Sequence, residues 1–302
     1  MTPVRVIVTV PPHATFLEEV ARHPIVSGLR LNTVMPIQGG HAAVLKRLAG
    51  LGKTLYVDLK GRQLRVVEAA VPPYTAVRVS HRVSVRTPVD AWFDAGRERA
   101  RVLAVDGDRL ILEDGPRRVI GPGESVNIVS PTLEIEGGLT AGDGLYVQAA
   151  RGLGLHDYML SYVEREEDVA EVRALDPAAR VTLKIESVRG LDLARAKGAS
   201  LGRLMAARGD LFVEVLRPHR VLAALREVIA ADPDAIAASR ILTSLSYGDV
   251  PEESDITDVG YLLALGYRTL MLGDEVCLKR DTVLEALNVI EAIAEDWPEA
   301  HR

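Results

Sequence analysis

The sequence has little cysteine, no long apolar run and no excess of positive charge. Cys277 is the single cysteine among 302 residues, which excludes a disulfide within the chain and favours a reducing compartment. No stretch reaches the roughly 20 apolar residues that span a bilayer, and the N-terminal MTPVRVIVTVPP lacks the pattern of a signal peptide. We therefore expect a cytoplasmic protein that does not bind membranes.

Charge balance and histidine spacing exclude two further classes of protein. The 36 basic and 42 acidic side chains give a net charge of −6, which argues against nucleic-acid binding. The seven histidines show neither HxxxH nor HxH spacing, so the sequence does not predict a zinc site. Hydrophobic residues make up 48% of the chain, enough for a large core. A globular protein that acts on small molecules fits these limits, and a homo-oligomer is compatible with them.

Short β-rich runs alternate with helical patterns along most of the chain. Helices are expected near 14–23, 41–51, 141–152 and 164–175, with another behind each later strand. Because strands that alternate with helices pair in parallel, eight such units predict an α/β fold, a (β/α)8 TIM barrel. The eight strands are expected at 4–10, 29–34, 54–59, 157–162, 181–187, 202–207, 240–245 and 268–273.

The alternation stops after the third strand. Residues 71–130 show short alternating strands and turn signals at Asp106-Gly107 and Asp114-Gly115, with a short helix expected near 89–97. This pattern predicts a small β-barrel-like domain at 71–130, inserted between two barrel segments at 1–70 and 131–302. Loops after barrel strands form the active-site face, so the insertion is interpreted as a lid, with a decorative or interface domain as the alternative.

Charged side chains are expected to converge inside the barrel. In the strand at 181–187, period-two alternation directs Thr182, Lys184 and Glu186 to the face opposite the apolar residues. Glu186 and Asp210 form a carboxylate pair suited to Mg²⁺ or Mn²⁺, and Gly209 allows the backbone to approach a ligand. Polar residues also follow other strands, namely Arg30, Asn32, Asp58, Lys60, Arg65, Thr243 and Glu275. Arginines suit phosphate, and Lys184 suits a transferring phosphoryl group.

These residues resemble motifs of the pyruvate kinase family. LKIES followed by MAARGDLFVEV is similar to that family's SKIEN and MVARGDLGVE at the same separation. RLNTV resembles its RLNFSH, VDLKGRQLR its DTKGPEIR, and GESVNI the GVNLPG that leaves its inserted β-domain. The resemblance covers nearly the whole chain and implies the same barrel with a β-rich lid.

The resemblance also implies roles for individual residues. It makes Glu186 and Asp210 the ligands of Mg²⁺ or Mn²⁺, and it makes Lys184, Thr243 and Arg30 catalytic. The substrate would be phosphoenolpyruvate, or the pyruvate enolate, and ADP or ATP would be the second substrate, as in glycolysis. The implied substrate-binding set is Arg30, Arg65, Lys184, Ala207, Arg208, Gly209, Asp210 and Thr243.

Several positions depart from the family pattern. Asn32 and Asp58 match two residues of the family's potassium site, but Val34 and Leu59 replace the Ser and Thr, so K⁺ is doubtful and Asn32 and Asp58 are weak candidates. The segment 61–63 reads GRQ where the family has GPE near the nucleotide phosphates. The sequence ends directly after the eighth expected helix, so the family's C-terminal regulatory domain is expected to be absent.

Three functions are consistent with these observations. A pyruvate kinase-like phosphotransferase is favoured by Lys184, and its nucleotide and potassium sites would be diverged. A metal-dependent lyase or aldolase that forms a pyruvate-type enolate, as in HpcH/HpaI-like enzymes, is favoured by the altered nucleotide region. A non-catalytic sensor has no need of the metal ligands, the lysine and both arginines together, so we expect an enzyme.

Overall fold

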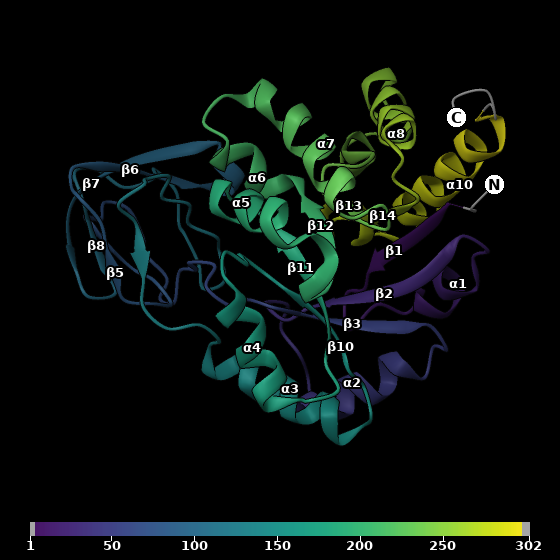
Figure 1. Cartoon of the computed structure of the whole chain (residues 1–302), viewed down its shortest axis with the longest axis horizontal. Coiled ribbons are helices and arrows are strands. Elements are labelled where there is room, and N and C mark those ends of the chain that lie inside the picture. Colours follow the sequence, from purple (N-terminus) through teal and green to yellow (C-terminus); the bar gives the residue numbers. More distant parts are fainter. Residues whose placement is uncertain (1–3, 298–302) are drawn as a thin grey trace.

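Residues 4–297 of the computed structural model are described here, and eight parallel strands among them close into a barrel (Figure 1). The strand order around the barrel is β1-β14-β13-β12-β11-β10-β3-β2, with every adjacent pair parallel. The predicted TIM barrel is confirmed. Its strands are β1 (Arg5–Thr9), β2 (Val26–Asn32), β3 (Thr54–Leu59), β10 (Asp157–Leu160), β11 (Arg180–Ile185), β12 (Arg203–Ala207), β13 (Ile236–Ala238) and β14 (Thr269–Leu272).

Helices surround the barrel and bury its outward-facing residues. The units that follow β12 and β14 each carry two α-helices. None of the helices in residues 4–297 is long and apolar enough to cross a membrane. The α-helices are α1 (Leu17–Arg22), α2 (His41–Ala49), α3 (Ala141–Gly152), α4 (Glu166–Leu175), α5 (Val188–Lys197), α6 (Arg208–Glu214), α7 (Val221–Ala231), α8 (Glu253–Leu265), α9 (Asp274–Cys277) and α10 (Arg280–Asp296). The 3-10 helices are η1 (Asp94–Gly96), η2 (Gly198–Leu201), η3 (Pro218–Arg220) and η4 (Thr243–Ser246).

The barrel interior contains a small apolar cluster separate from the core between strands and helices. Three methionines, Met159, Met205 and Met271, dominate this cluster, and each is at most 2% exposed. Ile7, Ala207, Ile236 and Ala238 complete the cluster. We call this cluster the methionine floor, because Met271 also lines the bottom of the polar cavity described below.

Gly202 allows close contact between β11 and β12. It has a φ of +152°, and a Cβ there would lie 2.1 Å from the carbonyl oxygen of Val181. Only glycine fits this position without displacing the backbone.

Antiparallel strands lie between β3 and α3, to one side of the barrel in Figure 1. One sheet has the order β4-β8-β7-β6, and β5 pairs with β9. These strands enclose their own apolar cluster, which runs from Leu64 to Ile135. The division of the chain at 71 and 130 stays a prediction. The strands are β4 (Ala76–Arg78), β5 (Val83–Ser84), β6 (Val89–Phe93), β7 (Glu98–Asp106), β8 (Arg109–Leu112) and β9 (Glu134–Ile135).

Several elements differ from the sequence prediction. The segment 240–245 is not a strand: the seventh barrel strand is β13, and the left-handed φ of Ser239, Arg240 and Leu242 interrupts extended backbone directly after it. The helix expected near 89–97 is wrong, because Val89–Phe93 pairs with β7 as the strand β6 and buries Ala91 and Phe93. Two runs of the insertion that were also expected as strands, RRVIG at 117–121 and ESVNIV at 124–129, make only isolated bridges.

Candidate active site

A polar cavity of about 210 Å³ opens at the carboxyl ends of the barrel strands. It combines barrel residues with residues that flank or belong to the insertion. Most of its side chains are charged or polar, although its floor is apolar. The lining residues are Arg30, Asn32, Gln63, Arg65, Ser125, Lys184, Glu186, Ala207, Gly209, Asp210, Ser239, Met271, Gly273 and Asp274.

Lys184, at the end of β11, is paired with two carboxylates. Its Nζ donates to Ser161 Oγ at 2.7 Å and lies 3.2 Å from Glu186 Oε1 and 3.4 Å from Asp58 Oδ1. Burial alone lowers the pKa of Lys184, but these carboxylates outweigh it and hold the pKa above its ordinary value. Lys184 is therefore a charged ammonium group inside the barrel, as the strand alternation predicts.

Glu186 and Asp210 bring two carboxylates to the same cavity. Glu186 Oε2 accepts from the backbone N–H of Tyr162 at 2.7 Å, and Asp210 Oδ2 accepts from Gln63 Nε2 at 2.8 Å. Burial raises the pKa of Glu186 to about 7; the charge of Lys184 opposes the shift and that of Asp210 adds to it. Repulsion between neighbouring carboxylates is relieved by a cation between them.

Arg30, on β2, is buried and clamped by two acids. Its Nε donates to Asp58 Oδ2 at 2.8 Å, its Nη2 donates to the same oxygen, and its Nη1 donates to Asp274 Oδ1 at 2.9 Å and Thr9 Oγ1 at 3.0 Å. Burial lowers the pKa of Arg30, but the negative charges of Asp58 and Asp274 have the larger combined effect and hold the pKa above its ordinary value. Four of the five guanidinium N–H donors are thus engaged within the protein.

Arg65 and Gln63 line another side of the cavity and contact each other. Arg65 Nη2 donates to Gln63 Oε1 and its Nη1 donates to the carbonyl of Gly123, while Gln63 continues the chain of contacts to Asp210. Arg65 Nε is buried without a hydrogen-bond partner in residues 4–297. A buried donor without a partner is costly, and a ligand oxygen in the cavity would satisfy it.

The two weak candidates for a potassium site surround a lysine. Lys60 Nζ lies 2.8 Å from Asn32 Oδ1 and 3.4 Å from Asp58 Oδ2. Burial lowers the pKa of Lys60 to about 7 against the attraction of Asp58. The Lys60 amino group thus contacts both Asn32 and Asp58, the two weak candidates for a monovalent-cation site.

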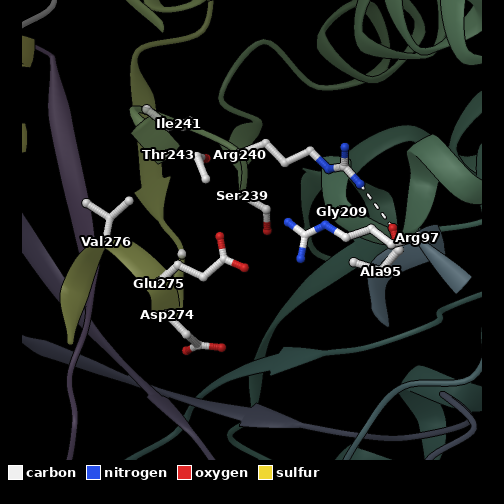
Figure 2. Close-up of a pocket in the computed structure, with 11 residues that line it drawn as sticks. Ala95, Arg97, Gly209, Ser239, Arg240, Ile241, Thr243, Asp274, Glu275 and Val276 are labelled. Carbon is white, nitrogen blue, oxygen red and sulfur yellow. Dashed lines mark hydrogen bonds between the residues drawn. The ribbon is translucent and has the colours of Figure 1, made fainter. Parts of the chain in front are cut away.

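Arg208 and Thr243 are among the predicted residues that do not line this cavity. Arg208 turns aside: Nη1 donates to Asp258 Oδ1 at 2.7 Å, and Nε and Nη2 donate to the carbonyls of Ser239 and Arg240. These contacts engage the guanidinium within the protein, and the place of Arg208 in the predicted carboxylate-binding turn stays a prediction. Thr243 begins η4 and lines an adjacent cavity (Figure 2).

Sequence reasoning missed five residues around the site. Gln63 and Ser125 sit on irregular backbone beside the insertion, and Ser161 and Ser239 follow β10 and β13. Asp274 follows β14 after one residue, Gly273. An acid at a strand end was the available signal, but the sequence drew attention to its neighbour Glu275 instead.

Curated proteins related to the chain are pyruvate kinases. The chain is 30% identical to a pyruvate kinase of Agrobacterium vitis over 213 residues, which is 68% of the chain and 43% of that protein. It is 30% identical to pyruvate kinase 2 of Saccharomyces cerevisiae over 212 residues, 67% of the chain and 41% of that protein. A pyruvate kinase of Thermoplasma acidophilum matches at 24% identity over 96% of the chain and 57% of the relative.

The chain spans about half the length of the curated relatives it matches. No model of a protein family matches the sequence. The similarity to several pyruvate kinases extends in some cases over nearly the whole chain, and the barrel with small antiparallel sheets agrees with the resemblance of the motifs. The chain is a relative of the pyruvate kinase family.

Proposed function

We propose that the chain is a divalent-metal-dependent phosphotransferase that acts on phosphoenolpyruvate, pyruvate or a related 2-oxo acid. The observation that carries this proposal is the position of Lys184, held between Asp58 and Glu186 in the cavity that also contains Asp210. A fixed ammonium group beside paired carboxylates suits a metal-bound, phosphorylated oxo acid. The pyruvate kinase relatives support the same reaction class.

The donor set fits a hard divalent cation. Glu186 and Asp210 offer carboxylate oxygens, which Mg²⁺ and Mn²⁺ prefer. No group of three or more His, Cys, Asp and Glu that could hold a metal occurs within residues 4–297, so substrate and water would supply the other ligands. When bound, the ion would polarise the substrate oxygens and neutralise their charge.

Each remaining residue has a defined task in this proposal. The ammonium group of Lys184 neutralises charge on the transferring phosphoryl group. The Arg65 Nε without a partner is available to one phosphate oxygen. Backbone N–H groups at the start of α6, around Gly209, are available to the substrate carboxylate. Val34 and Leu59 replace two residues of the family's potassium site, and Lys60 contacts the remaining Asn32 and Asp58, so K⁺ is not part of the proposal.

Two measurements test the proposed function. Oxalate mimics the pyruvate enolate, so calorimetry should show that oxalate binds only when Mg²⁺ or Mn²⁺ is present. This binding should be lost in the double variant Glu186→Gln, Asp210→Asn. Glu167→Gln, on the exposed side of α4, is the matched control. A coupled assay with phosphoenolpyruvate, ADP and Mg²⁺ should detect pyruvate, and Lys184→Met should lower the rate by at least about 100-fold while Lys197→Met leaves it unchanged. Oxalate binding that survives the double substitution contradicts the metal site.

A second candidate is a metal-dependent lyase or aldolase. Arg30 favours it, because Asp58, Asp274 and Thr9 already engage most of its donors and leave little for a phosphate. A lyase of this kind would release pyruvate from a 4-hydroxy-2-oxo acid. Pyruvate release from such a compound, with none from phosphoenolpyruvate under any nucleotide, would favour this candidate over the kinase.

A further inference from the structure

A second cavity of about 440 Å³ lies beside the candidate active site (Figure 2). Gly209, Ser239, Gly273 and Asp274 line both cavities, so the two are continuous. The second cavity extends past Thr243 to the tip of the insertion. We call it the outer cavity; its other lining residues are Ala95, Arg97, Arg240, Ile241, Thr243, Glu275 and Val276.

Two arginines from different parts of the chain line the outer cavity. Arg240 follows β13, stacks over the Phe212 ring at 4.4 Å and donates to the carbonyl of Ala95 at 3.3 Å. Arg97 reaches from the insertion towards the middle of the cavity in Figure 2, and its ion-pair partner is Asp94 at 3.4 Å. Stacking fixes the guanidinium plane of Arg240 and leaves its other N–H groups available.

Backbone strain is concentrated around the same cavity. Asp94, Ala95, Ser239, Arg240 and Leu242 have φ between +48° and +68°. They are five of the seven non-glycine residues with left-handed φ in the described chain. Such residues gather at binding sites, where the surrounding structure holds them. The guanidinium of Arg208 holds the barrel-side segment by binding two of its carbonyls.

We propose that the outer cavity is a subsite for an oxyanion, a carboxylate or a phosphate group, bound between Arg97 and Arg240. The inference rests on the proposed function, because the ligand's other end would lie at Lys184, Glu186 and Asp210. The Glu275 carboxylate points toward the guanidinium of Arg97 from the barrel side (Figure 2). The oxyanion belongs either to a 2-oxo acid longer than pyruvate or to the phosphoryl acceptor.

Calorimetric titrations with Mg²⁺ and three probes test the subsite. Oxalate fills only the first cavity, 2-oxoglutarate adds a distal carboxylate, and ADP adds phosphates. The variants are Arg97→Gln and Arg240→Gln, with Arg101→Gln as the control of equal charge on the exposed side of β7. Arg97 is 64% exposed, so its replacement does not threaten folding. Arg240→Lys keeps the charge without the planar fork if Arg240→Gln fails to fold.

At least one of the two larger anions should bind, and each glutamine variant should weaken it by about 10- to 100-fold. Both glutamine variants should bind oxalate as tightly as the unmodified protein does. The Arg101→Gln variant should bind all three probes with unchanged affinity. A loss confined to 2-oxoglutarate assigns the oxyanion to the oxo acid, and a loss confined to ADP assigns it to the acceptor. The subsite is overturned if neither anion binds, if neither depends on the arginines, or if oxalate weakens equally. Failure of oxalate to bind the unmodified protein overturns the proposed function instead.

Discussion

Glu214 should make the folded protein less stable as the pH rises, and Glu214→Gln should remove that dependence. Glu214 is 5% exposed and lies where the insertion meets the barrel. Its Oε1 accepts from the Tyr162 hydroxyl and from Asn127 Nδ2 at 3.4 Å. Burial raises the pKa of Glu214 from 4.5 to about 8, although both hydrogen bonds oppose the shift. The carboxyl group is therefore protonated in the folded protein at neutral pH.

The sign and size of the effect follow from this pKa. Because the folded state binds the proton more tightly than the unfolded chain, the stabilisation is complete below about pH 4.5 and is lost as the pH rises to about 8. Each pH unit corresponds to about 1.4 kcal/mol, so the loss is roughly 4 to 5 kcal/mol. A glutamine keeps the acceptor oxygen and carries no charge at any pH.

Urea unfolding at a series of pH values from 5 to 8.5 measures the effect. At pH 8, Glu214→Gln should unfold with a free energy several kcal/mol higher than the unmodified protein, and the two should converge near about pH 5. Glu167→Gln is the exposed control and should follow the unmodified protein. Parallel pH profiles for the unmodified protein and Glu214→Gln would refute the reasoning, because they would mean that Glu214 is ionised when folded.

Three further predictions concern stability and ligand affinity. Arg208→Met should lower the free energy of unfolding by about 1 to 3 kcal/mol, because it leaves the partly exposed Asp258 carboxylate and the carbonyls of Ser239 and Arg240 without their donor; an unchanged urea midpoint would contradict this. Gly202→Ala should cost about 2 kcal/mol or more, since its Cβ would meet the Val181 carbonyl, and thermal unfolding measures the loss. Asp274→Ala should tighten phosphoenolpyruvate binding by up to about tenfold, because it removes the acceptor of one Arg30 N–H; weaker binding in calorimetry would show that Asp274 assists the ligand.

Periodic patterns predicted the barrel because each strand repeats the same signal. The stretch at 181–187 carries alternation strong enough to orient Lys184 and Glu186 correctly, and the structure brings both to one cavity with Asp210. The seventh strand failed, because β13 has only three residues and reads Ile-Ala-Ala. The longer ILTSL segment after it gave the stronger pattern, although left-handed backbone excludes a strand there.

Contacts between distant segments were beyond the reach of local patterns. Nothing near Arg208 in the sequence indicates that its guanidinium binds Asp258, 50 residues away. Gln63 reaches Asp210 across 147 positions, and Asp274 reaches Arg30 across 244. Such pairs depend on which strand ends become neighbours when the barrel closes. The fold was therefore more predictable than the partners within the site.

The methionine floor has a consequence for how sequences of this kind can diverge. Thioether side chains are unbranched and adapt to irregular space, so exchange of Met159 or Met205 for leucine should cost less than about 1.5 kcal/mol. The floor lies directly beneath the charged layer and touches it at Met271. Substitutions in this adaptable methionine cluster can be accommodated without displacing Lys184, whereas in a rigid cluster each change of side-chain volume would shift the charged side chains above it. The sequence inside the barrel can therefore change while the charged residues of the cavity keep their positions.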